Sequence, residues 1–454
     1  MFDKKVLVAG CGRSGICATK LLIDKGEKVI LFDENKKNNL TVEGVLDNLE
    51  ETGKSPNLQV FFGQLSQEII SQISVMVISP GIPTDSEFAL KVKEHNIPVW
   101  SEIELAYYYE QGTVVAITGT NGKTTTTSLV GEIMKAWNPS SYVVGNIGIP
   151  YTQQVVNTTK DSITVAEISS FQLETIIDFK PKVAAILNVT PDHLDRHYTF
   201  ENYASCKAAV SKNQSDNEYV VVNYDDPETM KLVDSLAGKV VYFSRLEQLN
   251  QGVFVEDGLV VVKDSDKKIE VLNLSDIQIL GNHNVENVLA AVGIAYYMGV
   301  PVDVIGKVCT EFKGVPHRIE YVRTVNGVEY YNDSKGTNPD AAIKGIQAMK
   351  SATYLIGGGY DKKSSYDEWI DSFDGKVKKL VLLGQTASDI DKCAKSRGFV
   401  DTVFVESLEE AVQYCYKLAE PGESVLLSPA CASWGMFDNY EQRGDMFKEY
   451  VNKL

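Results

Sequence analysis

Residues 118–125 read Thr118-Gly119-Thr120-Asn121-Gly122-Lys123-Thr124-Thr125 and directly follow the apolar run 114–117. This stretch predicts a strand, a glycine-rich turn and the start of a helix, which together point backbone N–H groups and a lysine at a phosphate. The common pattern G-x-x-x-x-G-K-[ST] would need glycine where Ile117 stands. We therefore interpret the stretch as a shortened phosphate loop, with a glycine-rich connection that binds nothing as the alternative.

The composition of the chain indicates a soluble protein of several domains. Its 454 residues suggest about three domains at roughly 150 residues each. The 44 Lys and Arg against 61 Asp and Glu give a net charge of -17, which argues against a nucleic-acid surface. Seven cysteines without a C-x-x-C pair favour reduced thiols. With neither a signal peptide nor an apolar run of the ~18 residues needed for membrane insertion, we expect a cytoplasmic protein.

The first part of the chain predicts a βαβ unit. An apolar strand at residues 5–9 leads into Gly10-Cys11-Gly12-Arg13-Ser14-Gly15, and a second strand at residues 28–32 ends at Asp33. A G-x-G-x-x-G turn with an acidic residue at the next strand end is typical of dinucleotide binding. A nicotinamide enzyme would have no evident need for a second phosphate loop, so we expect no NAD. A further strand at 75–78 runs into a turn that contains Gly81.

Two more α/β units follow. Short apolar runs at 163–166, 183–187 and 218–222 are typical of buried parallel strands, whereas the alternation over 245–276 suggests a small antiparallel excursion. Residues 284–297 predict a helix, and the third unit contains predicted strands at 353–356, 379–383 and 424–427. We predict an α/β protein of three domains: a Rossmann-like N-terminal domain at 1–100, a central P-loop-type domain at 101–314 and a Rossmann-like C-terminal domain at 315–454.

Two polar segments follow strands of the central unit. Glu167 ends the strand at 163–166, where a carboxylate near a phosphate loop can bind Mg²⁺; an exposed or capping glutamate is the alternative. His193 and His197 have the spacing of a zinc helix, but Leu194 stands where H-E-x-x-H has its glutamate. We therefore favour a phosphate and metal site at His193 over a zinc hydrolase, and a surface position for His197.

Polar loops also follow the predicted strands of the third unit. Residues 331–339 and 428–434 combine small and hydroxyl side chains that suit a carboxylate or phosphate, and the run 357–362 brings Lys362 to a strand end. Each could be an ordinary loop. Together with the central unit they suggest one site shared between domains.

These motifs resemble the Mur ligase family, and within it the members that add D-glutamate. The resemblance to the family rests on residues 118–125, 188–196 and 281–287. The resemblance to the members that add D-glutamate rests on residues 167–174, 332–338 and 428–433. It implies ATP-dependent amide formation from UDP-N-acetylmuramoyl-L-alanine and D-glutamate, with ATP and Mg²⁺ as cofactors. Activation of the alanine carboxylate by the γ-phosphoryl group would precede attack by the D-glutamate amine. We expect a monomer that inserts into no membrane.

The resemblance also implies the site residues. The catalytic residues would be Lys123, His193, Lys207 and Glu167. The ligands of Mg²⁺ would be Thr124, Glu167, His193 and Lys207. Lys207 would be carbamylated, which turns its side chain into a metal-binding carboxylate. ATP would contact Gly119, Thr120, Asn121, Gly122, Lys123, Thr124, Thr125, Thr126, Asn284, Asn287, Arg318 and Asp333. The UDP-linked substrate would contact Arg13, Ser14, Asp33, Gly81 and Asn146, and D-glutamate would contact Thr337, Lys362, Ser433 and Tyr440. Glu34-Asn35 replaces the Thr-Arg of some relatives, which leaves the uracil contacts of that loop open.

Two alternatives remain. A sibling Mur ligase or a folylpolyglutamate-type ligase would share the phosphate loop and central unit but use another acceptor; one that takes a diamino acid would need an acidic partner for the distal amine. An ATP-dependent switch protein without chemistry would need no acceptor at all.

Overall fold

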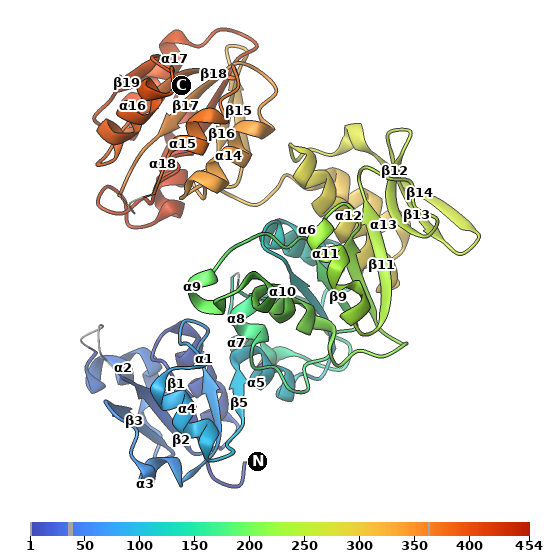
Figure 1. Ribbon diagram of the computed structural model, residues 1–454, viewed down its shortest axis with the longest axis vertical. Coiled ribbons are helices and arrows are strands. Elements are labelled where there is room, and N and C mark those ends of the chain that lie inside the picture. The colour runs from blue at the N-terminus through green and yellow to red at the C-terminus, as the bar shows by residue number, and fades with distance from the viewer. Residues whose placement is uncertain (1, 35–39, 147, 362–363) are drawn as a thin grey trace. The chain divides into compact units, whose positions relative to one another are not determined.

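A computed structural model describes residues 2–34, 40–146, 148–361 and 364–454. The chain forms two compact units, Met1–Leu274 with Glu286–Cys309, and Ser275–Val285 with Thr310–Leu454. The first unit contains a sheet of five strands and one of nine, and the second unit contains a sheet of six. Three α/β domains, one for each sheet, confirm the predicted fold class (Figure 1). The predicted domain boundaries, between residues 100 and 101 and between residues 314 and 315, stay a prediction.

The first sheet is parallel throughout, in the order β3-β2-β1-β4-β5. Leu7 and Ile30 pack into the core on one face, whereas Val8 and Leu31 pack into the core on the other, as alternating residues of a sheet buried on both faces must. The chain reverses direction across the sheet between β1 and β4, where ligands of such sheets bind. The elements are β1 (Lys5–Ala9), α1 (Arg13–Asp24), β2 (Val29–Asp33), α2 (Val42–Leu49), η1 (Glu50–Lys54), β3 (Leu58–Phe62), α3 (Gln67–Ile70), β4 (Ile73–Ile78), α4 (Glu87–Glu94), β5 (Val99–Ser101) and α5 (Glu102–Tyr109).

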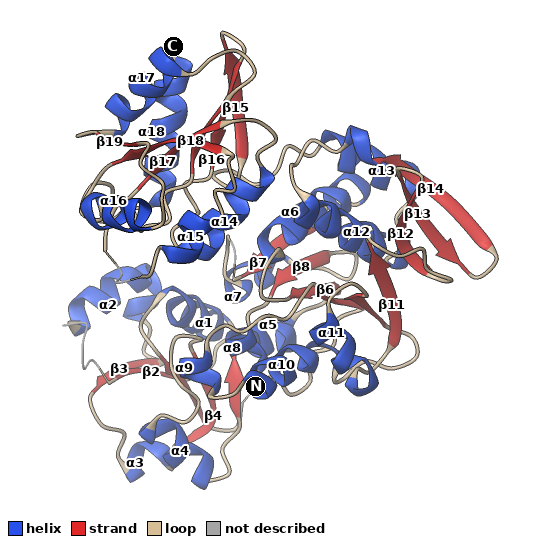
Figure 2. Ribbon diagram, turned by 45° about the horizontal axis from the view of Figure 1, so that its top comes forward, coloured by secondary structure: helices blue, strands red, loops and turns tan. Residues whose placement is uncertain are grey.

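The second sheet has the order β14-β13-β12-β11-β10-β9-β6-β8-β7. Strands β7 to β12 pair in parallel, whereas β12, β13 and β14 pair antiparallel, which confirms the predicted excursion (Figure 2). Its elements are β6 (Thr113–Thr118), α6 (Lys123–Trp137), β7 (Ser141–Gly145), α7 (Tyr151–Gln154), η2 (Val155–Asn157), β8 (Ile163–Glu167), α8 (Ser170–Leu173), β9 (Val183–Ile186), α9 (Leu194–His197), α10 (Phe200–Ala208), η3 (Ala209–Ser211), β10 (Tyr219–Asn223), α11 (Pro227–Leu232), η4 (Val233–Ser235), β11 (Lys239–Ser244), β12 (Gly252–Glu256), β13 (Leu259–Asp264) and β14 (Lys267–Asn273). Then follow η5 (Leu274–Asp276), α12 (Asn282–Tyr297) and α13 (Val302–Glu311).

The strand order of the second sheet explains where its polar segments meet. Strand β6 pairs with β8 on one side and β9 on the other, so the carboxyl ends of all three strands lie along one edge. The phosphate loop, Glu167 and the segment that begins at Asn188 follow these three ends. They are neighbours because parallel pairing aligns the strand ends, although they lie far apart in the sequence.

The third sheet has the order β15-β16-β20-β17-β18-β19, with only β15 antiparallel to its neighbour. Leu355 and Leu426 pack with Trp369 on one face, and Ile356 and Leu427 pack on the other. The elements are β15 (Glu320–Val325), β16 (Val328–Asn332), α14 (Pro339–Ala348), β17 (Thr353–Gly357), α15 (Asp367–Asp371), β18 (Val377–Leu382), α16 (Ala387–Ser396), β19 (Thr402–Phe404), α17 (Leu408–Leu418), β20 (Ser424–Leu427) and α18 (Tyr440–Asn452). Among the described residues, no helix has the length and apolar character that crossing a membrane requires.

Candidate active site

The phosphate loop connects β6 to α6, as predicted. Gly122 caps the helix in a left-handed conformation with φ of +84°, which glycine adopts without strain. The helix then begins at Lys123, so the N–H groups of its first turn have no intrahelical acceptors. The Lys123 ammonium donates to the carbonyl oxygens of Gly119 and Thr120, both at 2.8 Å. This N-terminus, with a lysine folded over the loop, suits an anionic phosphate.

The loop is also bonded to the segment after β9. The N–H of Thr120 donates to the carbonyl oxygen of Asn188 at 2.9 Å, and the N–H of Asn121 donates to the Asn188 side chain at 2.8 Å. The Thr120 hydroxyl lies 2.9 Å from the Tyr203 hydroxyl. These contacts place Thr120 and Asn121 in the scaffold of the loop. Further along α6, the Thr126 hydroxyl donates to Asn287 Oδ1 at 3.2 Å.

Glu167 is the last residue of β8 and is only 2 % exposed. One carboxylate oxygen accepts a hydrogen bond from Asn146 Nδ2 at 2.8 Å, and the other has no hydrogen-bond partner among the described residues. A buried carboxylate oxygen without a donor is costly unless a cation or water satisfies it. Together with the buried Thr124 hydroxyl at the start of α6, this oxygen donor set fits Mg²⁺. The exposed-glutamate alternative is therefore wrong.

Lys207 lies on α10 and is 1 % exposed. Its ammonium donates to the Gly119 carbonyl oxygen at 2.8 Å and lies 4.5 Å from the centre of the Tyr203 ring. Burial, and then the positive charge of Lys123, lower the pKa of Lys207 well below its usual value. The structure thus places the Lys207 amine at the phosphate loop, and its carbamylation and metal binding stay predictions.

The two histidines of the central segment differ in environment. His193, with φ of 53°, precedes α9; its side chain is about half exposed and lies beside the Phe171 ring at 4.8 Å. His197 is 5 % exposed and its Nε2 lies 3.0 Å from the Ser170 hydroxyl, so the predicted surface position is wrong. The single turn of α9 turns His197 inward against Tyr203. Within the described residues, no three His, Cys, Asp or Glu side chains form a metal cluster.

Of the predicted UDP-substrate residues, Arg13, Ser14, Asp33 and Gly81 lie at strand ends of the first sheet, whereas Asn146 follows β7 of the second sheet. Arg13 and Ser14 open α1, and the Asp33 carboxylate at the end of β2 accepts the Cys11 N–H at 3.1 Å. Gly81 lies exposed in the turn after β4. Asn35 lies outside the described residues, so the structure does not test the departure at that loop.

In the second unit, Asp333 follows β16 and is 4 % exposed. Its carboxylate accepts the Ser428 hydroxyl at 2.7 Å and the Ile319 N–H at 3.2 Å. Burial raises the pKa of Asp333 to about 7. Arg318, whose Nε is buried without a hydrogen-bond partner among the described residues, contributes a weaker opposing attraction. Asn284 donates through its side chain to the Leu280 carbonyl oxygen at 2.7 Å.

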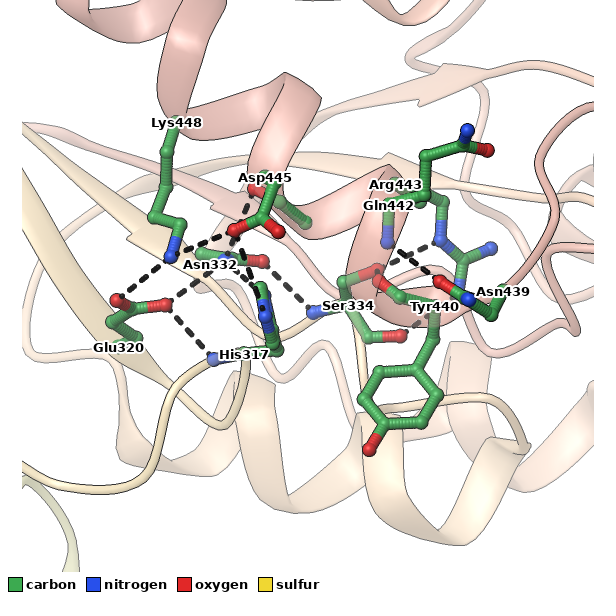
Figure 3. A network of polar contacts seen from close by, with 11 residues as sticks. His317, Glu320, Asn332, Ser334, Asn439, Tyr440, Gln442, Arg443, Asp445 and Lys448 are labelled. Carbon is green, nitrogen blue, oxygen red and sulfur yellow. Dashed lines mark hydrogen bonds and ion pairs between the residues drawn. The ribbon is translucent and has the colours of Figure 1, made fainter. Parts of the chain in front are cut away.

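Thr337 and Ser433, two of the predicted D-glutamate residues, lie in loops that a buried arginine joins, and Tyr440 begins α18. Arg443 of α18, 2 % exposed, donates to the Ser334 hydroxyl at 2.9 Å, the Ser334 carbonyl oxygen at 2.8 Å and the Cys431 carbonyl oxygen at 3.2 Å. The Ser334 hydroxyl in turn donates to the Tyr440 carbonyl oxygen, while the Tyr440 ring points away from these contacts (Figure 3). Arg443 thereby links the loops of Thr337 and Ser433 to α18.

Lys362 lies outside the described residues, so the structure does not test its predicted role. Two residues that sequence reasoning missed organise the loops: Asn188 in the first unit and Arg443 in the second. Asn188 could have been noticed as a side chain with both a donor and an acceptor directly after a strand. Arg443 gave no such signal, because a helical arginine in a charged sequence is usually exposed.

Family models match each of the three parts of the chain. Residues 4–101 match the family model of the Mur ligase MurD-like N-terminal domain, residues 117–295 the Mur ligase middle domain, and residues 317–431 the Mur ligase glutamate ligase domain. The chain is similar to the UDP-N-acetylmuramoylalanine--D-glutamate ligase of Lachnoclostridium phytofermentans, at 51% identity over 99% of this chain and 98% of the relative. The corresponding ligase of Lachnospira eligens is 49% identical over 100% of this chain and 99% of its own.

Solved structures support the fold. The UDP-N-acetylmuramate-alanine ligase of Thermotoga maritima superposes with a TM-score of 0.59 at 20% identity, covering 99% of both chains. A pseudomurein peptide ligase type C from Methanothermus fervidus superposes with a TM-score of 0.57 at 19% identity, covering 99% of this chain and 100% of its own. Since family models match all three domains and full-length relatives share about half of the residues, the chain belongs to the Mur ligase family.

Proposed function

We propose that the chain is an ATP-dependent ligase that joins D-glutamate to UDP-N-acetylmuramoyl-L-alanine in peptidoglycan precursor synthesis. The observation that supports this most strongly is the 51% identity, over nearly the whole chain, to a ligase with that substrate name. The phosphate loop before α6, with Lys123 folded across it, supports the use of a nucleotide phosphate. We place the reaction in the cytoplasm and expect a monomeric enzyme.

The reaction needs activation because a carboxylate is a poor electrophile. The alanine carboxylate oxygen attacks the γ-phosphorus, ADP leaves, and an acyl phosphate forms. The D-glutamate amine then attacks the acyl carbon, loses a proton and expels phosphate, which gives the amide. The Lys123 ammonium and the N–H groups at the start of α6 reduce the repulsion between two anions, and bound Mg²⁺ would add charge neutralisation.

Each remaining site residue has a proposed role. Thr124 and Glu167 would hold one Mg²⁺, and His193 with a carbamylated Lys207 would hold a second. The remaining loop residues Gly119 to Thr126, with Asn284, Asn287, Arg318 and Asp333, would position ATP. Arg13, Ser14, Asp33, Gly81 and Asn146 would hold the UDP-linked substrate, and Thr337, Lys362, Ser433 and Tyr440 would hold D-glutamate.

A panel of acceptors tests the substrate assignment. Phosphate release would be measured with ATP, Mg²⁺ and UDP-N-acetylmuramoyl-L-alanine, with D-glutamate, L-glutamate, L-alanine and a diamino acid supplied in turn. We expect D-glutamate to give the highest kcat/KM. Lys123→Ala is the control for background phosphatase and should lose about a hundredfold or more in turnover, since removal of one such charge costs ~3 kcal/mol or more in the transition state. Preference for another acceptor would assign the chain to a sibling ligase.

A further inference from the structure

The Asn188 side chain forms a two-point contact with the tip of the phosphate loop. Its Oδ1 accepts the Asn121 N–H at 2.8 Å, and its Nδ2 donates to the Asn121 carbonyl oxygen at 3.1 Å. Both backbone groups of one loop residue are therefore bonded to a single amide. Such a contact fixes the orientations of the two peptide planes on either side of Asn121, because each of these groups belongs to one of them.

Asn188 is itself held firmly. The Leu187 N–H donates to the Thr118 carbonyl oxygen at 3.0 Å, which continues the pairing of β9 with β6. On the other side, the Val189 N–H donates to the Asp226 carboxylate at 3.0 Å. Bonds to both neighbours anchor the backbone of Asn188 to the sheet and to the start of α11. The Asn188 side chain therefore holds Asn121 of the loop at a fixed position relative to the sheet.

A second set of bonds runs beside the first. The Thr120 hydroxyl accepts the Thr190 N–H at 3.0 Å and donates to the Thr190 carbonyl oxygen at 3.2 Å. With the Thr120 N–H also bonded to the Asn188 carbonyl oxygen, the Thr120 and Asn121 N–H groups both face the 188–190 segment. These two N–H groups thus point away from a phosphate, and the N–H groups at the start of α6 are the ones that would face it.

We propose that Asn188 is a positioning residue for phosphoryl transfer, which rests on the function proposed above. By holding the Asn121 peptide groups, it sets the turn into Gly122 and so aims the N–H groups of the first turn of α6, and the Lys123 amine, at one phosphate position. The role requires an amide. Aspartate would place an anionic oxygen against the Asn121 carbonyl oxygen and beside the bound phosphate, and alanine would remove both bonds.

The chain offers a matched control at the other end of α6. Asn138 is partly buried like Asn188, its Oδ1 accepts the Ser140 N–H at 3.0 Å, and its Nδ2 donates to the Asp161 carbonyl oxygen at 2.7 Å. It therefore makes the same pair of bonds to backbone groups, away from the phosphate loop. Any loss of activity or stability that follows merely from removing an asparagine with two such bonds should appear in Asn138→Ala as well.

The test compares Asn188→Ala, Asn188→Asp and Asn138→Ala in the full chain, by steady-state kinetics and by calorimetric binding of a non-hydrolysable ATP analogue. We expect kcat/KM for ATP to fall about tenfold or more in both Asn188 variants, because two hydrogen bonds are lost or opposed. The KM for D-glutamate and the melting temperature should match those of Asn138→Ala. The isosteric Asn188→Asp keeps the fold testable should the alanine variant unfold.

An equal loss in Asn138→Ala, or an unchanged kcat/KM for ATP in Asn188→Asp, would overturn the proposal. The binding measurement separates this inference from the proposed function. If the wild-type chain binds the ATP analogue but uses another acceptor, the acceptor assignment fails while the role of Asn188 is still tested by the affinity of its variants.

Discussion

Lys207 illustrates how burial can change what a side chain does. In the sequence it is an ordinary lysine on a helix, and only the resemblance singled it out. In the structure it is buried against the phosphate loop, near Lys123, and its pKa lies well below the usual lysine value. A neutral amine is a nucleophile and can add to dissolved CO₂, losing one proton to form a carbamate. That anion would remove the repulsion between two neighbouring ammonium groups.

We expect Lys207→Ala to lose most turnover and to regain part of it when acetate or propionate is added, since a short carboxylate can occupy the space of the carbamate. Phosphate release across a range of carboxylate concentrations would measure the rescue. Lys123→Ala is the control that carboxylates should not rescue, because its role requires a cation. Activity of Lys207→Ala that is indifferent to carboxylates would contradict carbamylation.

At the residue scale, the sequence predicted which side chains lie at the candidate site better than it predicted how deeply each of them is buried. Glu167 was predicted as a carboxylate at a strand end and lies there with one unsatisfied oxygen. His197 was predicted at the surface and is buried, because a one-turn helix after the left-handed His193 turns it inward. Burial of this kind depends on which elements pack together, and local spacing contains no such information.

At the scale of elements, the phosphate loop depends on the backbone of Gly122. A Cβ atom there would lie 2.3 Å from Asn287 Oδ1, and the φ of +84° is strained for any other residue. Asn287 also accepts the Thr126 hydroxyl, so the side chain cannot yield without disturbing α6. Any other residue at this position would be strained and would have to displace Asn287.

We expect Gly122→Ala to weaken binding of the ATP analogue severely and to lower the melting temperature, since left-handed strain alone costs roughly 1–2 kcal/mol. Gly26→Ala is the matched control: it has φ of +80° but nothing within 4 Å of the added Cβ. Calorimetry and thermal melts of both variants separate the strain from the clash. Equal nucleotide affinity in the two variants would show that the Asn287 contact is unimportant.

Elements with strong local patterns were predicted well, and edge elements were not. The strands at 5–9 and 424–427 have the predicted limits, and both lie inside their sheets. Strands β3, β7 and β19 had no prediction and lie at the edges of their sheets; the partly exposed β11, inside the second sheet, had none either. A short, partly exposed strand is defined mainly by its pairing partner, which the local sequence does not specify.

At the scale of the whole molecule, the proposed reaction requires three bound substrates. We expect steady phosphate release only when ATP, UDP-N-acetylmuramoyl-L-alanine and D-glutamate are all present, because water must not replace the amine as the nucleophile. Omitting each substrate in turn, with phosphate as the readout, tests this dependence. Continuous ATP hydrolysis without D-glutamate would favour a nucleotide switch over a ligase.

The length of the chain, and its three sets of short apolar runs with glycine-containing turns, were sufficient to predict three α/β domains. The order of strands was not predictable, because parallel strands are ordered by contacts between distant segments. The 188–190 segment shows the consequence: its bonds to the phosphate loop follow from the pairing of β9 with β6.

The strand order of the third sheet also constrains when that sheet can form. β20 lies between β16 and β17, although it follows both of them in the chain. β16 can pair with β15, and β17 with β18, before then, but these two parts of the sheet can join only after residues 424–427 have been synthesised. Such long-range closure is slow, and it leaves strand edges unpaired on the growing chain. Ribosome-bound chains that stop short of β20 should therefore be targets for chaperones.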